Sequence, residues 1–184
     1  MLIFIDLDGT LFDTYSLNPQ NNGEWIYAYA SAPLMKGANE TISELNNNGD
    51  YCIAITQRGI NLGRIVYDIS KNAILSRIKP KSNIKGLIWK VDNKTKFIVE
   101  NHEKINHTIG KHYSFNQIVL IDDDIDTVAQ AAQAGFLGIL FGAKSTDTTS
   151  KLPPNLKIAE DWNEVKTIIN TYKSITKKIK CKKQ

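Results

Sequence analysis

The chain has 184 residues, of which 42% are hydrophobic and 23% charged, and a formal net charge of +4. This length suits one domain with a full core, and the composition is that of a soluble globular protein. No apolar run approaches a membrane span, the first residues lack the basic region of a secretory signal, and Cys52 and Cys181 do not suggest a disulfide framework, so a cytoplasmic setting is expected.

In chain order, apolar runs bounded by turn residues alternate with amphipathic stretches. The apolar runs predict buried strands and the amphipathic stretches predict helices. The predicted elements are a strand at 2–6, a helix at 37–50, a strand at 51–56, a helix at 63–75, a short strand at 87–91, a helix at 94–109, a strand at 117–122, a helix at 126–135, a strand at 136–141, and an edge segment and final helix within 151–173. This alternation predicts an α/β fold, a Rossmann-like doubly wound parallel sheet with helices on both faces.

Residues 12–33 fit this alternation least and are interpreted as an insertion. Trp25, Tyr27 and Tyr29 alternate within it, which is typical of a hairpin flap lying over a site. Packing of these rings onto the sheet is the alternative interpretation.

Three of the predicted strands end in polar residues that can carry chemistry. They end in Asp6-Leu7-Asp8, Thr56-Gln57-Arg58 and Asp122-Asp123-Asp124. Ligands bind at the carboxyl ends of the strands in a doubly wound sheet, so these residues are expected to meet at one edge. Capping of the following helix is an alternative for any one cluster, but a weak one for all three.

Four or more carboxylates gathered at one sheet edge repel one another unless a cation neutralises them. Mg²⁺ suits carboxylate oxygens and water, and it needs neither histidine nor thiolate. The sequence therefore predicts a Mg²⁺ site at this edge.

The same segments resemble the motifs of a known superfamily. The sequence DLDGT (6–10) is similar to the first motif of the haloacid dehalogenase-like (HAD) phosphatases, AIT (54–56) to the second, and LIDDD (120–124) to the acidic fourth. The resemblance covers most of residues 1–142. It implies the HAD-like fold and a hydrolase that acts on phosphoric monoesters through an aspartyl-phosphate intermediate.

The resemblance also implies catalytic roles. Asp6 would be the nucleophile, and Asp8 would protonate the leaving oxygen and then activate water. Thr56 would donate a hydrogen bond to a phosphoryl oxygen. The metal ligands would be Asp6, Asp8, Asp122 and Asp123, with a backbone carbonyl of Leu7 or Asp8 contributing.

The third motif is a lysine that pairs with the nucleophile and with the phosphoryl charge. Lys94 and Lys96 both stand at the start of the helix predicted over 94–109. Lys94 is preferred as the catalytic lysine because it follows the expected helix cap, Asn93, and Lys96 is kept as a candidate for substrate binding.

Further candidates for substrate binding lie beside the first two motifs. Gly9 and Thr10 would let backbone amides approach the phosphate. Arg58 follows the second motif directly and would reach the phosphate or the rest of the substrate, a surface salt bridge being the alternative.

The gaps between the motifs are too short for a folded cap domain of the usual size. An open site would admit a phosphorylated protein, a nucleic acid end or a small phosphorylated molecule. A phosphotransferase or mutase, a polynucleotide-end phosphatase and a catalytically idle binding module stay open as alternatives.

The last twelve residues, 173–184, hold six lysines and no acid. They are interpreted as a basic C-terminal tail that follows a single domain over 1–172. A solvated helix end is the simpler reading of this tail, and an electrostatic contact with nucleic acid or an anionic membrane surface is the alternative.

Overall fold

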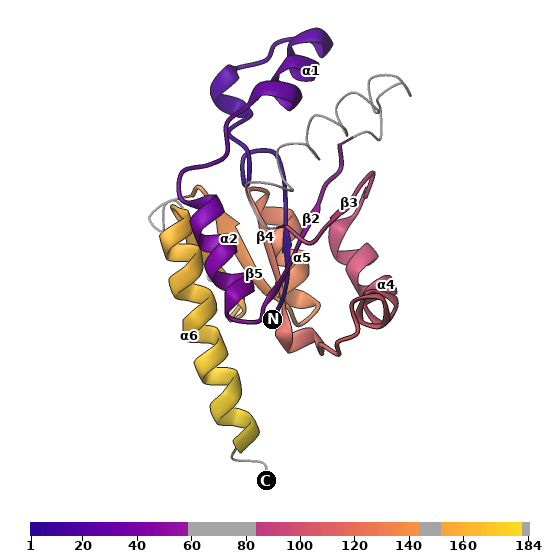
Figure 1. Ribbon diagram of the computed structural model, residues 1–184, viewed down its shortest axis with the longest axis vertical. Coiled ribbons are helices and arrows are strands. Elements are labelled where there is room, and N and C mark those ends of the chain that lie inside the picture. The colour runs from indigo at the N-terminus through magenta and orange to yellow at the C-terminus, as the bar shows by residue number, and fades with distance from the viewer. Residues whose placement is uncertain (59–83, 144–151, 182–184) are drawn as a thin grey trace.

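The computed structural model describes residues 1–58, 84–143 and 152–181. Within them the strands form one parallel sheet in the order β3-β2-β1-β4-β5-β6 (Figure 1). The strands are β1 (Leu2–Ile5), β2 (Tyr51–Ile55), β3 (Gly86–Ile88), β4 (Ile118–Asp122), β5 (Leu137–Phe141) and β6 (Leu156–Ala159). The predicted α/β fold with a doubly wound parallel sheet is confirmed.

Outside the insertion, the helices also follow the predicted order. They are α1 (Asn22–Ser31), α2 (Ala38–Asn47), α4 (Lys94–Ile109), α5 (Ile125–Gln133) and α6 (Trp162–Cys181), with short 3-10 helices η1 (Tyr15–Leu17) and η2 (Phe115–Gln117). The helix predicted over 63–75 lies outside the described residues. Helix α6 continues to Cys181, so the lysine-rich stretch begins inside this helix. Within the described residues, no helix combines the length and the apolar composition that a membrane crossing requires.

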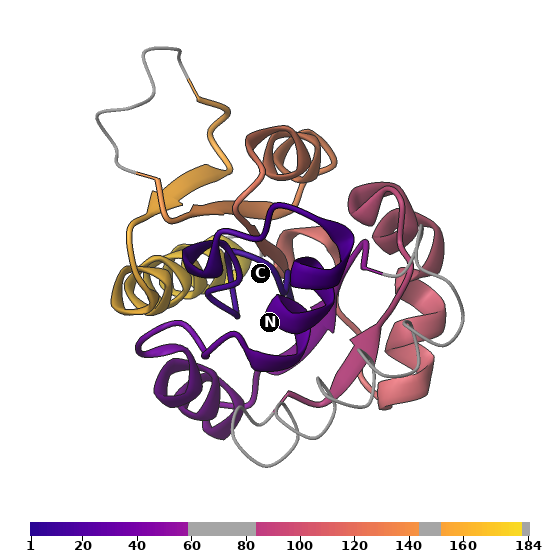
Figure 2. The ribbon, with the colours of Figure 1, turned by 90° about the horizontal axis from the view of Figure 1, so that it is seen from above.

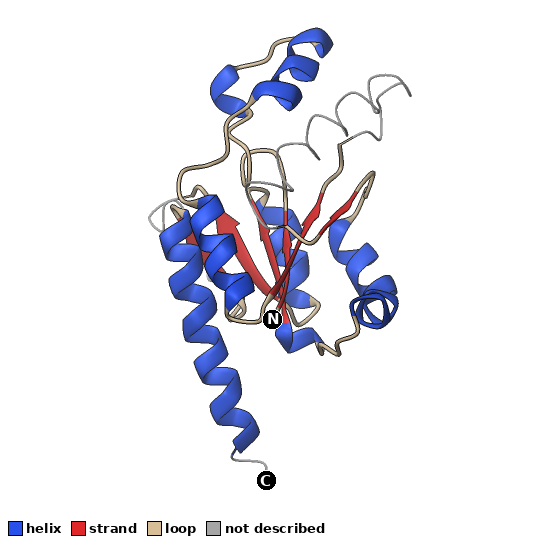
Figure 3. Cartoon of the chain, in the orientation of Figure 1, coloured by secondary structure: helices blue, strands red, loops and turns tan. Residues whose placement is uncertain are grey.

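Two layers of helices cover the sheet (Figures 2 and 3). Because successive strand residues face opposite sides, Ile3 and Ile5 pack toward α2 and α6, whereas Leu2 and Phe4 pack toward α4 and α5. All four side chains are fully buried. Burial on both faces explains why the strands read as continuous apolar runs rather than as alternating patterns.

The insertion is helical, so the prediction of a hairpin flap is wrong. The side chain of Asn21 accepts a hydrogen bond of 3.1 Å from the backbone N–H of Glu24, which caps α1. In a helix, residues four apart share a face, so Trp25 and Tyr29 lie together. Tyr27 lies between them in sequence and is 67% exposed. The alternation that suggested a strand therefore reflects two faces of a helix.

Candidate active site

The ends of three neighbouring strands bring the predicted site residues together. β1 lies between β2 and β4, and the strand order reverses between β1 and β4, where ligands bind in doubly wound sheets. Asp6 extends the ladder one residue beyond β1, because its backbone N–H donates to the carbonyl of Ile121 at 2.9 Å. Asp122 ends β4 and Thr56 follows β2. Helix α1 lies above this edge of the sheet (Figure 1).

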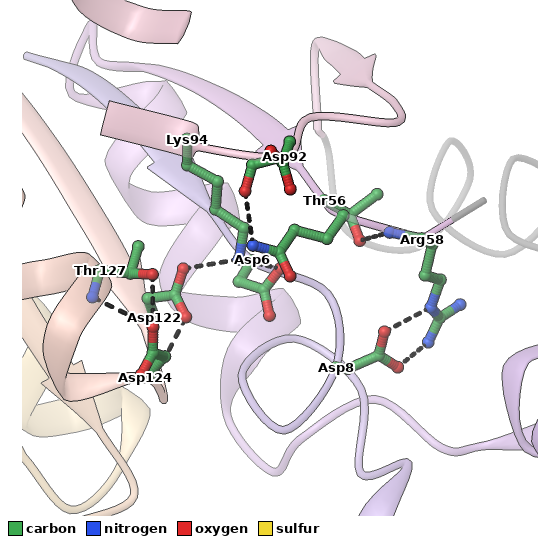
Figure 4. Close-up of polar contacts among 10 residues, drawn as sticks. Asp6, Asp8, Thr56, Arg58, Asp92, Lys94, Asp122, Asp124 and Thr127 are labelled. Carbon is green, nitrogen blue, oxygen red and sulfur yellow. Dashed lines mark hydrogen bonds and ion pairs between the residues drawn. The ribbon is translucent and has the colours of Figure 1, made fainter. Parts of the chain in front are cut away.

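Lys94 joins the carboxylates of two of these strands (Figure 4). Its Nζ lies 2.7 Å from Oδ1 of Asp6 and 2.7 Å from Oδ2 of Asp122, and the residue is 6% exposed. Helix α4 begins at Lys94, and the side chain of Asn93 caps it by accepting from the backbone N–H of Lys96 at 2.8 Å. The cap thus fixes the place of Lys94 at the sheet edge.

Lys96 is placed elsewhere, although it is only two residues further along α4. Its side chain is 72% exposed, and its Nζ lies 3.9 Å from a carboxylate oxygen of Glu100. The structure does not bring Lys96 to the site, because two residues on a helix point about 200° apart around its axis.

Asp6, Asp122 and Asp123 form a group suited to a metal ion. Each offers one carboxylate oxygen, and these oxygens lie within 4.8 Å of one another. With the three carboxylates ionised and Lys94 protonated, the group carries two net negative charges, which a divalent cation would balance. Hard carboxylate oxygens without histidine or thiolate fit Mg²⁺.

Burial and mutual repulsion hold these acids toward their neutral forms in the metal-free protein. Burial, together with the charge of Asp122, raises the pKa of Asp6 to about 7, although the ammonium of Lys94 opposes the shift. Burial and the charge of Asp6 raise the pKa of Asp123 to about 6. The group therefore lacks compensating positive charge.

Asp8 lies outside this metal group, and its carboxylate is paired with Arg58. Nε of Arg58 donates to Oδ2 of Asp8 at 2.6 Å, and Nη2 donates to Oδ1 (Figure 4). The guanidinium carbon also lies 4.1 Å from the ring centroid of Tyr29, and Arg58 is 4% exposed. Metal ligation by the Asp8 carboxylate is therefore not part of this arrangement, and ligation by its backbone carbonyl stays a prediction.

Arg58 is no surface salt bridge. Its Nη1 is buried and has no hydrogen-bond partner among the described residues. Its backbone N–H donates to Oγ1 of Thr56 at 3.0 Å, which leaves the Thr56 hydroxyl proton available to a ligand. The structure thus pairs Arg58 with Asp8 and places Thr56 at the end of β2, beside the strand that leads to Asp6.

Gly9 has a different role from the one predicted. Its backbone N–H donates to the carbonyl of Phe12 at 2.9 Å, so this amide is already occupied. Gly9 adopts a φ of 71°, and a Cβ there would lie 2.4 Å from Oδ2 of Asp123 and 2.4 Å from Cε2 of Tyr15. Glycine is required because two site residues approach the backbone. Thr10 is fully buried, its Oγ1 has no partner among the described residues, and binding through its amide stays a prediction.

Asp124 is a capping residue rather than a member of the metal group. Its side chain accepts from the backbone N–H of Thr127 at 3.1 Å and from the Thr127 hydroxyl at 2.5 Å (Figure 4). The two adjacent acids thus have different roles: Asp123 belongs to the metal group, and Asp124 caps α5.

The sequence analysis did not single out Tyr15, whose ring lies beside Gly9 and the Asp123 carboxylate. The available signal was its position just after the first motif, in an insertion that holds four aromatic residues between 15 and 29.

No protein-family model matches the chain, and no curated protein matches it by sequence. Solved structures match it in fold. One is the D,D-heptose 1,7-bisphosphate phosphatase from B. bronchiseptica complexed with magnesium and phosphate, which is 15% identical over 92% of this chain and 98% of its own, with a TM-score of 0.63. Another is the cobalt-bound deoxy-D-mannose-octulosonate 8-phosphate phosphatase from Haemophilus influenzae, which is 16% identical over 94% of this chain and 88% of its own, with a TM-score of 0.61.

An L-2-haloacid dehalogenase has a similar fold, with 11% identity over 92% of this chain and 97% of its own and a TM-score of 0.59. The chain thus has the haloacid dehalogenase-like fold that its motifs suggested. Because phosphatases and a dehalogenase share this fold, the chemistry has to be argued from the site.

Proposed function

We propose that the chain is a Mg²⁺-dependent phosphomonoester hydrolase that works through an aspartyl-phosphate on Asp6. The observation that carries this proposal is the meeting of Asp6, Asp122 and Asp123 beside the buried ammonium of Lys94. Two of the structures with the same fold are titled as phosphatases of phosphorylated sugars, which supports a small phosphorylated molecule as substrate.

The metal would be held by Asp6, Asp122 and Asp123, where it would offset the negative charge of the phosphoryl group and of the carboxylates. Lys94 would hold the Asp6 carboxylate in place, since its Nζ lies 2.7 Å from Oδ1. The second oxygen of Asp6 would then be the attacking atom. The Thr56 hydroxyl would donate to a phosphoryl oxygen.

In the first step, an oxygen of Asp6 forms a bond to phosphorus, and the ester oxygen leaves with the electron pair of its own bond to phosphorus. Asp8 would give the leaving oxygen a proton. In the second step, Asp8 would take a proton from a water molecule whose oxygen attacks phosphorus, which releases phosphate and restores Asp6.

The pairing of Asp8 with Arg58 sets a condition on this scheme. Both carboxylate oxygens of Asp8 accept hydrogen bonds from the guanidinium, so neither is free to carry a proton to a leaving group. Asp8 must give up at least one of these bonds during turnover. A phosphoryl group that attracts Arg58 would release it.

The proposal is tested by following p-nitrophenyl phosphate hydrolysis with metal-depleted protein, with and without Mg²⁺. We expect turnover only with Mg²⁺, and a loss of more than about 1,000-fold in kcat for Asp6→Asn, because removal of a nucleophile abolishes the covalent route. Asp126→Asn, an exposed acid in the first turn of α5, is the matched control and should keep its activity.

Two outcomes would contradict the proposal: turnover that persists in Asp6→Asn, or turnover that is indifferent to Mg²⁺. Acid quenching followed by mass spectrometry should find phosphate on the peptide that contains Asp6. If an added alcohol captures the phosphoryl group in competition with water, the protein is a phosphotransferase of the same chemistry.

A further inference from the structure

Three aromatic side chains of the insertion form a row beside the site. The ring centroids of Tyr15 and Trp25 lie 6.0 Å apart with perpendicular planes, and those of Trp25 and Tyr29 lie 5.5 Å apart. The row ends at Arg58, whose guanidinium packs against the Tyr29 ring and pairs with Asp8. One end of the row is thus fixed to a predicted catalytic residue.

The other end of the row lies at the metal group. A Cβ on Gly9 would come equally close to the Tyr15 ring and to the Asp123 carboxylate, so these two groups flank the same backbone position. The Tyr15 ring therefore lies beside an acid of the metal group.

Packing alone does not account for Tyr15. Its side chain is 53% exposed, although an aromatic ring that only held the insertion together would bury its faces. Ring surface is therefore left open to solvent next to the place where phosphorus would react.

The row carries little charge. Residues 14–31 contain a single charged residue, Glu24, and no lysine or arginine. Arg58 pairs with Asp8 through Nε and Nη2, and Lys94 pairs with Asp6 and Asp122. Beyond these two residues, the segment 14–31 itself supplies no cation for a second phosphate or carboxylate of a substrate.

We propose that Tyr15, supported by Trp25 and Tyr29, forms a subsite for a planar aromatic group attached within a few bonds of the phosphate ester. This inference rests on the proposed function and names its substrate class: phosphate monoesters of uncharged alcohols that carry an aromatic ring. Tyr15 is the specificity-determining residue, because its half-exposed ring lies nearest to the metal group. Trp25 and Tyr29 are positioning residues that hold this ring between Arg58 and Asp123.

The test compares benzyl phosphate with n-propyl phosphate. Both are esters of primary alcohols, so the pair varies the ring with little change in the leaving group. We expect the wild type to favour benzyl phosphate by about five- to tenfold in kcat/KM, the effect of one aromatic contact.

Three variants assign this preference to Tyr15. Tyr15→Leu keeps apolar bulk without a flat ring and should lose the preference, with kcat/KM falling at least about fivefold more for benzyl phosphate than for n-propyl phosphate. Tyr15→Phe keeps the ring and should retain the preference. Tyr27→Leu, in the same insertion but 67% exposed, is the matched control and should behave as wild type. Equal turnover of the two esters by the wild type, or an equal loss for both in Tyr15→Leu, would overturn the inference.

Binding separates this inference from the proposed function. Benzylphosphonate and n-propylphosphonate resist hydrolysis, and their affinities can be measured by calorimetry in the presence of Mg²⁺. If neither ester is hydrolysed but benzylphosphonate binds more tightly in the wild type and not in Tyr15→Leu, the subsite stands and the proposed function fails. If the two phosphonates bind equally or not at all, the subsite is refuted whatever the activity.

Discussion

Lys94 places its ammonium between two carboxylates that belong to neighbouring strands. Burial by itself would lower the pKa of Lys94, but the charges of Asp6 and Asp122 outweigh it and raise the pKa. The side chain therefore stays charged, and it offsets part of the repulsion between the two carboxylates at the strand ends. Removal of the Lys94 charge alone would leave two buried carboxylates without a positive partner, which is costly.

We expect Lys94→Met to lower kcat for p-nitrophenyl phosphate by more than about 100-fold, since a preorganised charge at the reacting group is lost. Lys96→Met removes the same kind of charge two residues away, where the side chain is 72% exposed, and should change kcat by less than about twofold. Thermal unfolding in Mg²⁺ would check that both variants fold. An equal effect of the two substitutions would contradict the role of Lys94.

The sequence allowed the prediction that Asp6 and Asp122 meet, because parallel strands that both end in acids must present them at one edge. The choice of Lys94 over Lys96 followed from the helix cap at Asn93. The pairing of Asp8 with Arg58 could not be predicted in the same way, because it joins side chains 50 residues apart through their rotamers.

Helix α5 and strand β5 approach each other unusually closely. A Cβ on Gly138 of β5 would lie 2.5 Å from the backbone carbonyl oxygen of Val128 in α5. Helix α5 begins at Ile125, two residues after Asp123, so we expect the depth of this helix on the sheet to affect the position of this metal-group acid.

Gly138→Ala should destabilise the protein by about 1–3 kcal/mol, because backbone atoms must shift to admit the methyl group. Gly86→Ala is the matched control in strand β3, where the nearest atom to an added Cβ is Cγ2 of Ile53 at 3.9 Å. Denaturant unfolding of both variants measures the difference. Similar free energies of unfolding for the two would show that the contact with α5 can relax.

The prediction of helices and strands succeeded where the apolar pattern and the helix caps indicated the same element. Helix α4 has the bounds expected from its sequence, with Asn93 as cap and Gly110 in the left-handed conformation after its end. The prediction of a hairpin for the insertion failed because three alternating aromatic residues are compatible with a strand and also with two faces of a helix. The cap formed by Asn21 and Glu24 was the local signal for the helix.

The molecule as a whole places one acidic cluster at the reversal point of a doubly wound sheet, under a small helical insertion (Figure 1). The fold could be predicted from the sequence because strands buried on both faces are continuous apolar runs. The substrate could not be predicted from the same pattern, because it depends on how the insertion packs over the site.

The acidic cluster should make the stability of the metal-free protein depend on pH. The pKa values of Asp6 and Asp123 are raised to about 7 and about 6 by burial and repulsion, so the folded protein binds more protons than the unfolded chain between about pH 4 and 7. Stability from these groups is therefore full at the acid end and declines as pH rises through this window. Mg²⁺ binds the ionised carboxylates, so its stabilising effect should grow over the same window.

Titration of the metal-depleted protein with Mg²⁺ by calorimetry, at pH 5 and pH 8, tests the shared metal site most directly. We expect one Mg²⁺ per chain, bound more tightly at pH 8, with binding lost in Asp123→Asn and retained in Asp124→Asn, because the neighbouring acid caps α5 instead of joining the group. Failure of the wild type to bind Mg²⁺ at pH 8, or equal binding by the two variants, would contradict the account.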